Sequence, residues 1–152
     1  MNVIVSKAGI HSVGGNRNGY GAFLQTINAS GRRLAVVKCR DDFGAIDEPL
    51  AFWQETITIG AYTSWDDADY NVDTAYNRIV AAAQNKPGIK FWEYYNERDG
   101  DYAQQTDLYI QLLPRLAPLG IGLCMYNSAS GTPRTPDEDG GAAYAEIART
   151  CR

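Results

Sequence analysis

The sequence predicts an α/β fold in which about five parallel strands alternate with helices. Short apolar runs, rich in β-branched residues, alternate with segments whose apolar residues recur at helical spacing. No linker rich in Pro, Gly or Ser divides the chain, and no short internal repeat is visible. At 152 residues and 45% hydrophobic content, the chain can bury the core of one domain.

Charge and hydropathy exclude two classes of partner. The chain has 14 basic and 18 acidic residues, a net charge of −4, so we expect no nucleic-acid partner. No run approaches the roughly 20 apolar residues of a membrane helix, and no signal peptide is visible, so we expect a soluble protein of unknown localisation. Cys39, Cys124 and Cys151 lack metal-like spacing and are expected to be free thiols.

The first strand–helix unit opens the chain. A strand within Val3–Ile10 is expected to stop at His11, before a glycine-rich turn. Gly31 is expected to stop the helix that follows. Residues at i, i+3, i+4 and i+7 mark that helix: Tyr20, Phe23, Leu24 and Ile27.

Two further units follow. Leu34–Cys39 is predicted as a strand, and a short helix is expected near Asp47 with Pro49 in its first turn. Thr56–Ala61 alternates as a third strand. The clearest helical periodicity in the chain comes next, carried by Val72, Ala75, Tyr76, Ile79, Val80 and Ala83.

The last units are Ile89–Tyr95 as a strand, Asp101–Leu119 as a helix that Pro114 should bend or interrupt, and Ile121–Tyr126 as a fifth strand. A polar loop over 127–141 and the start of a helix over 142–152 complete the chain. The pattern ends without a helix stop, so we expect a truncated chain. A complete doubly wound sheet of this size is the alternative.

Polar and aromatic residues gather at the predicted strand ends, which in a parallel barrel lie at one rim. Each taken singly is also explained by solvation or packing; their grouping favours a site. They are His11, Lys38, Arg40, Asp41, Asp42, Tyr62, Trp65, Asn96, Glu97, Arg98, Tyr126, Asn127 and Ser128.

The sharpest motif is the segment from Phe91 to Arg98, FWEYYNER, an aromatic strand that ends in an amide and a carboxylate. It resembles the W-E-x-W/Y-N-E-P strand of clan A glycoside hydrolases. The resemblance implies a (β/α)8 barrel in which Glu97 is the general acid/base and Asn96 contacts the sugar. Residues 1–152 would then be a single domain, a partial TIM barrel that forms the N-terminal portion of a (β/α)8 barrel.

The chemistry agrees with this resemblance. A glycosidic oxygen leaves more readily when protonated, so a carboxyl with a raised pKa in an aromatic-walled site is suitable. Trp92, Tyr94 and Tyr95 are candidates for that wall. Arg98 replaces the usual proline, and its charge would lower the pKa of Glu97. Retaining hydrolysis also needs a second carboxylate about 5 to 5.5 Å away, which the clan places on a seventh strand that this chain does not reach.

Substrate contacts are expected from His11, Lys38, Asp41, Trp65, Tyr95 and Asn127. Lys38 could instead fix a catalytic carboxylate through charge-assisted bonds. The aspartates near 41 and 66 do not match a calcium loop, and the glycines at 14–21 do not match a phosphate loop, so neither metal nor cofactor is expected.

The leading hypothesis is a glycosidase acting on O-glycosidic bonds of a carbohydrate, with net retention, and inactive in this chain alone. The alternative is a barrel that binds carbohydrate, or serves as a scaffold, without catalysis. An unrelated open-sheet α/β protein is a third interpretation.

Overall fold

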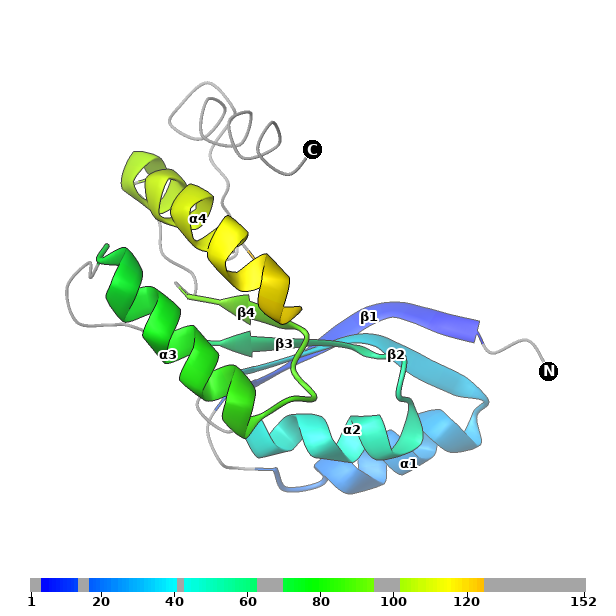
Figure 1. Cartoon of the computed structure of the whole chain (residues 1–152). Helices are drawn as coiled ribbons and strands as arrows, with labels where there is room; N and C mark the ends of the chain where they lie inside the picture. The colour runs from blue at the N-terminus through cyan, green and yellow to red at the C-terminus, as the bar shows by residue number, and fades with distance from the viewer. Residues whose placement is uncertain (1–3, 14–16, 41–42, 63–69, 95–101, 125–152) are drawn as a thin grey trace.

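The protein folds around a sheet of five parallel strands (Figure 1). The structure, a computed structural model, describes residues 17–40, 43–62, 70–94 and 103–124, and the backbone alone of 4–13 and 102. Neighbouring strands follow chain order: β1 (Ile4–Val13), β2 (Arg32–Arg40), β3 (Ile57–Ala61), β4 (Phe91–Glu93) and β5 (Gly122–Leu123). All four pairings are parallel. The predicted α/β class and parallel sheet are therefore confirmed.

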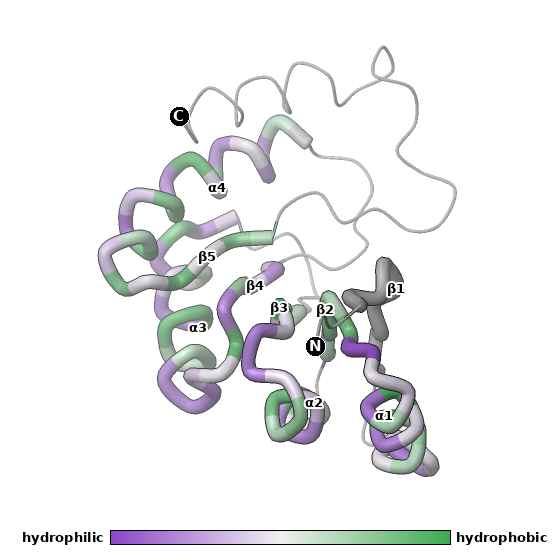
Figure 2. Tube along the Cα trace, turned by 90° about the vertical axis from the view of Figure 1, so that its right-hand side faces the viewer, coloured by the Kyte–Doolittle hydropathy of each residue, from purple (hydrophilic) through white to green (hydrophobic). Residues whose placement is uncertain are grey.

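Within the described residues, four α-helices and two 3-10 helices connect the strands. They are α1 (Tyr20–Ala29), η1 (Phe43–Ile46), α2 (Asp47–Phe52), α3 (Val72–Asn85), α4 (Tyr102–Leu116) and η2 (Ala117–Leu119). Seen nearly along the strands, the sheet forms an arc with α1–α4 on its outer side (Figure 2). Crossovers between parallel strands are right-handed, so strands paired in chain order place successive helices on one side. A doubly wound sheet instead reverses its strand order and carries helices on both faces. We call the side of the sheet away from the helices the open face.

The first strand is longer than the sequence predicts. It continues past His11 to Val13, and His11, Ser12 and Val13 pair with Lys38, Cys39 and Arg40 of β2. The register shifts between Ser6 and Gly9, which lets the strand keep its pairing along β2. The expected stop at His11 is wrong, because a neighbouring strand satisfies the backbone there.

Helix ends follow the local chemistry. The Asn71 side chain caps α3 by accepting from the backbone N–H groups of Asp73 and Thr74, both at 3.0 Å. Gly31 has a φ of 71°, the left-handed conformation expected after α1. Pro114 lies inside α4 without interrupting it. The helix ends two residues later and passes into η2, so proline sits in its last turn.

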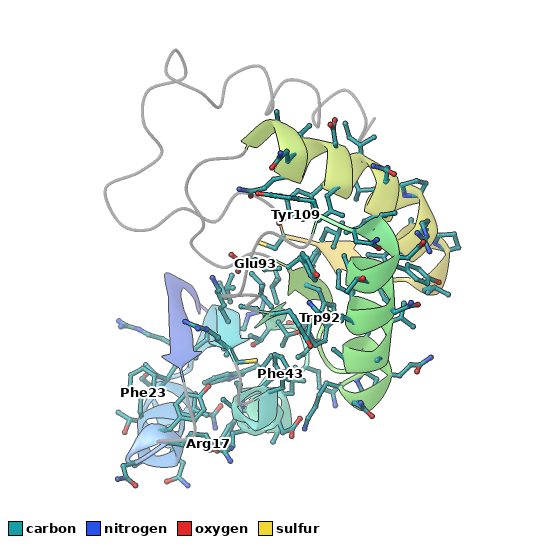
Figure 3. The ribbon with its side chains drawn as sticks, turned by 90° about the vertical axis from the view of Figure 1, so that its left-hand side faces the viewer. Arg17, Phe23, Phe43, Trp92, Glu93 and Tyr109 are labelled. Atoms are coloured by element: carbon teal, nitrogen blue, oxygen red, sulfur yellow. The ribbon has the colours of Figure 1, made fainter. Side chains whose placement is uncertain are left out.

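The core lies between the sheet and the helices. Val37, Cys39 and Trp92 alternate with residues of the open face and are fully buried. Gly60 leaves room for the Trp92 ring, because a Cβ there would lie 2.8 Å from that ring. Phe43 meets the same ring edge-on, with centroids 5.1 Å apart (Figure 3). Among the described residues, no helix has the length and apolarity to cross a membrane.

Candidate functional site

The carboxyl-terminal half of the open face carries charged side chains from two strands. The strand register places Arg40, Ala61 and Glu93 in one row across β2, β3 and β4. Lys38 lies two residues before Arg40 and points to the same side. Both Lys38 and Glu93 alternate with core residues, so they belong to the open face.

Lys38 and Glu93 form a buried ion pair. The distance from Lys38 Nζ to Glu93 Oε2 is 2.7 Å, and the exposed fractions of the two residues are 8% and 0%. The pair connects β2 to β4 across β3, where Ala61 contributes only a methyl group. Because desolvating two charges costs several kcal/mol per ion, such a pair depends on close contact between its partners.

Cys124 interacts electrostatically with Lys38 and Glu93, and we call these three residues the charged group. It follows β5 and is a free, partly buried thiol. Burial raises the pKa of Cys124, the Glu93 carboxylate raises it further, and the Lys38 ammonium opposes both. The ionisation of the Cys124 thiol therefore depends on the charges of Lys38 and Glu93, which lie on β2 and β4.

The amino-terminal half of the open face is apolar. Ile57 is 43% exposed and Phe91 38% exposed, which is unusual for large apolar side chains on a parallel sheet. The Phe91 ring lies over Gly122, where a Cβ would come within 2.5 Å of it. The open face thus grades from apolar residues at the strand starts to charged residues at the strand ends.

The candidate residues of the FWEYYNER motif follow Glu93 in the sequence. Glu93 is the last residue of β4, and Tyr95, Asn96 and Glu97 follow it outside the described residues. The predicted contacts Asp41, Trp65 and Asn127 also lie outside them. His11 is described by its backbone alone and pairs with Lys38 in the register. Of the predicted catalytic residues and substrate contacts, the structure therefore describes the side chain of Lys38 alone.

The predicted aromatic wall is wrong for two of its members. Trp92 packs against Phe43 on the helix side. Tyr94 faces α3, where Arg78 Nη1 donates to its hydroxyl at 3.3 Å, and its ring stacks on Tyr62 with centroids 6.2 Å apart. Strand alternation sends Trp92 to the helix side, and the chain turns Tyr94 to the same side just after β4 ends.

Two residues of the charged group, Glu93 and Cys124, were not among the predicted site residues. A signal for Glu93 was available, since both Lys38 and Glu93 stand as charged residues inside apolar strands, and a buried charge needs a partner. Nothing in the sequence distinguishes Cys124 from an ordinary core cysteine. Within the described part of the chain, no group of three or more His, Cys, Asp or Glu side chains is arranged to hold a metal ion.

Comparison of the chain with protein-family models, with curated proteins and with solved structures gives no match. The arguments for function therefore come from the residues and from their arrangement on the sheet.

Proposed function

We propose that this chain is the N-terminal part of a (β/α)8 barrel that cleaves O-glycosidic bonds, with Glu97 as general acid/base and Asn96 as its companion. The observation that carries the proposal is the position of the motif. The segment that resembles the clan A strand contains β4, the fourth of five parallel strands in chain order, and Asn96 and Glu97 follow its carboxyl end. In barrel enzymes, catalytic residues come from these ends.

The arrangement of the layers supports a barrel. Helices on the outer side of an arc, and strands paired in chain order, are what repeated right-handed β/α units produce. The exposed Ile57 and Phe91 side chains support it as well, because the inside of a closed barrel is packed with branched and bulky apolar residues. Further strands on this side would bury them.

The charged group is suited to form the buried base of a sugar-binding site, where it would not contact the substrate directly. Glu93 is fully buried and paired with Lys38, so it is not accessible to act on substrate. Glu93 is the last residue of β4 and lies four residues before Glu97. Its ion pair therefore holds the strand end that precedes the proposed site. Lys38 in this setting stabilises a buried carboxylate that is not itself catalytic, so its expected contact with substrate and its expected hold on a catalytic carboxylate both stay predictions.

The test is hydrolysis of a panel of oligosaccharides by the protein that carries this chain, with and without Glu97→Gln. The variant should lose most of its turnover on any substrate that the wild type cleaves, since general acid/base catalysis typically contributes about 100-fold to 10,000-fold. Glu55→Gln, at an exposed glutamate outside the proposed site, is the matched control. Equal turnover by wild type and Glu97→Gln would remove Glu97 from the mechanism.

A barrel that binds carbohydrate without cleaving it is the second candidate. One observation favours it: the carboxylate that the described open face presents, Glu93, is buried against Lys38 and is unsuited to serve as nucleophile. Sugar binding measured by calorimetry, lost in Trp65→Ala and accompanied by no hydrolysis, would decide for this candidate.

A further inference from the structure

The open face carries a group of neighbouring apolar side chains near the strand starts. Val36, Ile57, Ile59 and Phe91 alternate with core residues on β2, β3 and β4, so they belong to this face. Val36 pairs with Ile57, and Ile59 pairs with Phe91, which makes the four residues neighbours across three strands. Ile57 and Phe91 are 43% and 38% exposed, and the other two are partly exposed. We call these four residues the apolar patch.

The apolar patch lacks a cover in the part of the chain that the structure describes. Helices α1–α4 lie on the outer side of the arc, and none of them reaches the open face (Figure 2). Parallel sheets occur almost only with both of their faces covered, because their strands are apolar on both sides. A single uncovered face with large apolar side chains is therefore the mark of an interface.

The length of the chain bears on what can cover this face. The five strands begin at residues 4, 32, 57, 91 and 122, so one strand–helix unit takes about 30 residues. Residues 125–152 have the length of about one such unit, whereas a barrel of eight strands needs three units beyond β5. One polypeptide of residues 1–152 is therefore too short to enclose its own patch as a barrel does. A second copy supplies further strands.

We infer that two copies of residues 1–152 form a dimer by packing their open faces against each other. Two-fold dimers are the commonest oligomers, and each partner uses the same surface. The distribution of side chains sets the direction of the axis. A two-fold axis parallel to the strands brings the strand starts of both copies to one level, so patch meets patch. An axis across the strands would instead place each patch on the Lys38–Glu93 pair of the other copy.

The shape and the charge of the face agree with this arrangement. Each sheet is an arc with its helices outside, so two facing arcs enclose the apolar patches between them (Figure 2). The axis parallel to the strands also keeps all strands of both copies running in one direction. At the strand ends, Lys38 and Glu93 neutralise each other within one copy. In a longer protein with further strands of its own, those strands would take the place of the second copy.

Sedimentation velocity of the polypeptide of residues 1–152 tests the inference. The chain should sediment as a dimer that dissociates on dilution. Ile57→Glu and Phe91→Glu should each raise the dissociation constant more than about tenfold, because each places an uncompensated carboxylate in the apolar interface. Phe23→Glu is the matched control, since Phe23 is 44% exposed but lies on α1, on the helix side. It should leave the dissociation constant unchanged.

A mixture of two charge variants tests the direction of the axis. Phe91→Glu and Phe91→Lys should each dimerise poorly, because like charges meet at the same level of the interface. Mixed together, they should associate more than about tenfold more tightly than either variant does alone, since opposite charges then meet. Mixing does not reverse a loss of fold, and circular dichroism of each variant measures the fold directly.

Four outcomes would overturn the inference. The first is a chain that stays monomeric up to about 1 mM, and the second is association that continues past the dimer. The third is a dimer that Ile57→Glu and Phe91→Glu leave unchanged, or that Phe23→Glu weakens as much. The fourth is a mixture that associates no more tightly than its components. None of these measurements involves a substrate, so their result is independent of whether Glu97 acts in catalysis.

Discussion

Lys38 Nζ and Glu93 Oε2 meet at 2.7 Å across the middle strand of the sheet, with both side chains withdrawn from water. The pair connects the second and fourth strands through their side chains, whereas their backbones are each paired to β3. It also places a carboxylate of the FWEYYNER segment, four residues before Glu97 in the chain, on the open face.

The pair should be far more sensitive to single than to double substitution. Lys38→Met leaves the Glu93 carboxylate buried without its cation, and Glu93→Gln leaves the ammonium of Lys38 without its anion. Each should lower the free energy of unfolding by about 3 to 5 kcal/mol, because a buried charge loses the partner of its ion pair. Lys38→Met combined with Glu93→Leu should recover most of the loss. Urea unfolding measures all three.

A matched control is the ion pair of partly buried Arg33 with Glu55, whose side chain is 77% exposed. Arg33→Gln should cost less than about 1 kcal/mol, since solvent screens that pair. If Lys38→Met were as mild as Arg33→Gln, the buried pair would contribute nothing that distinguishes it from a surface contact.

Cys124 provides a chemical probe of the same group. Burial and the Glu93 carboxylate raise the pKa of its thiol, so iodoacetamide should alkylate it more slowly than a free cysteine near pH 8.5, the ordinary thiol pKa being about 8.5. Glu93→Gln removes a charge that raises this pKa and should accelerate the reaction. Lys38→Met removes the charge that lowers it and should slow the reaction.

The alkylation is measured by mass spectrometry in a Cys151→Ser background, with buried Cys39 as the internal reference. Opposite changes in the two variants are the decisive result. The same change in both would mean that loosened packing, and not charge, controls the thiol.

Gly60 should not tolerate a methyl group. A Cβ at this position would lie 2.8 and 2.9 Å from two atoms of the buried Trp92 ring, which Phe43 holds from another side. Gly60→Ala should therefore cost about 1 to 3 kcal/mol of unfolding free energy, the usual range for overpacking. In a Trp92→Leu background the same substitution should cost much less. A cost that is equal in both backgrounds would show that the ring is not what the methyl group meets.

The sequence predicts the order and type of the elements well because each prediction uses local information. Helical spacing marks α1 and α3, and Gly31 marks the end of α1. The strand lengths depend instead on their neighbours. β1 extends because Arg40 continues to pair with it, and β4 shortens to Phe91–Glu93 although the apolar run begins at Ile89.

The candidate site is less predictable from the sequence than the elements are, because it also depends on contacts with neighbouring strands. Lys38 can be placed on the open face by alternation, but its partner depends on the register of two other strands. The aromatic chemistry of Trp92 and Tyr94 predicts a place in the site, but the sheet turns both side chains toward the helices.

Tyr20 should make the fold sensitive to alkaline pH. Its hydroxyl donates to the backbone oxygen of Ala45 at 3.1 Å, and burial, reinforced by the Glu48 carboxylate, raises its pKa from 10.0 to about 12. A phenol whose pKa is higher in the folded than in the unfolded state adds stability that is complete below pH 10. This contribution is lost as pH rises through 12, because only the unfolded chain ionises freely in between.

Tyr20→Phe removes the titrating group, so the advantage of the wild type over the variant in unfolding free energy should shrink between pH 10 and 12. Urea unfolding at a series of pH values measures this difference, and an advantage that stays constant over that interval would mean that Tyr20 ionises in the folded protein as it does in the unfolded chain.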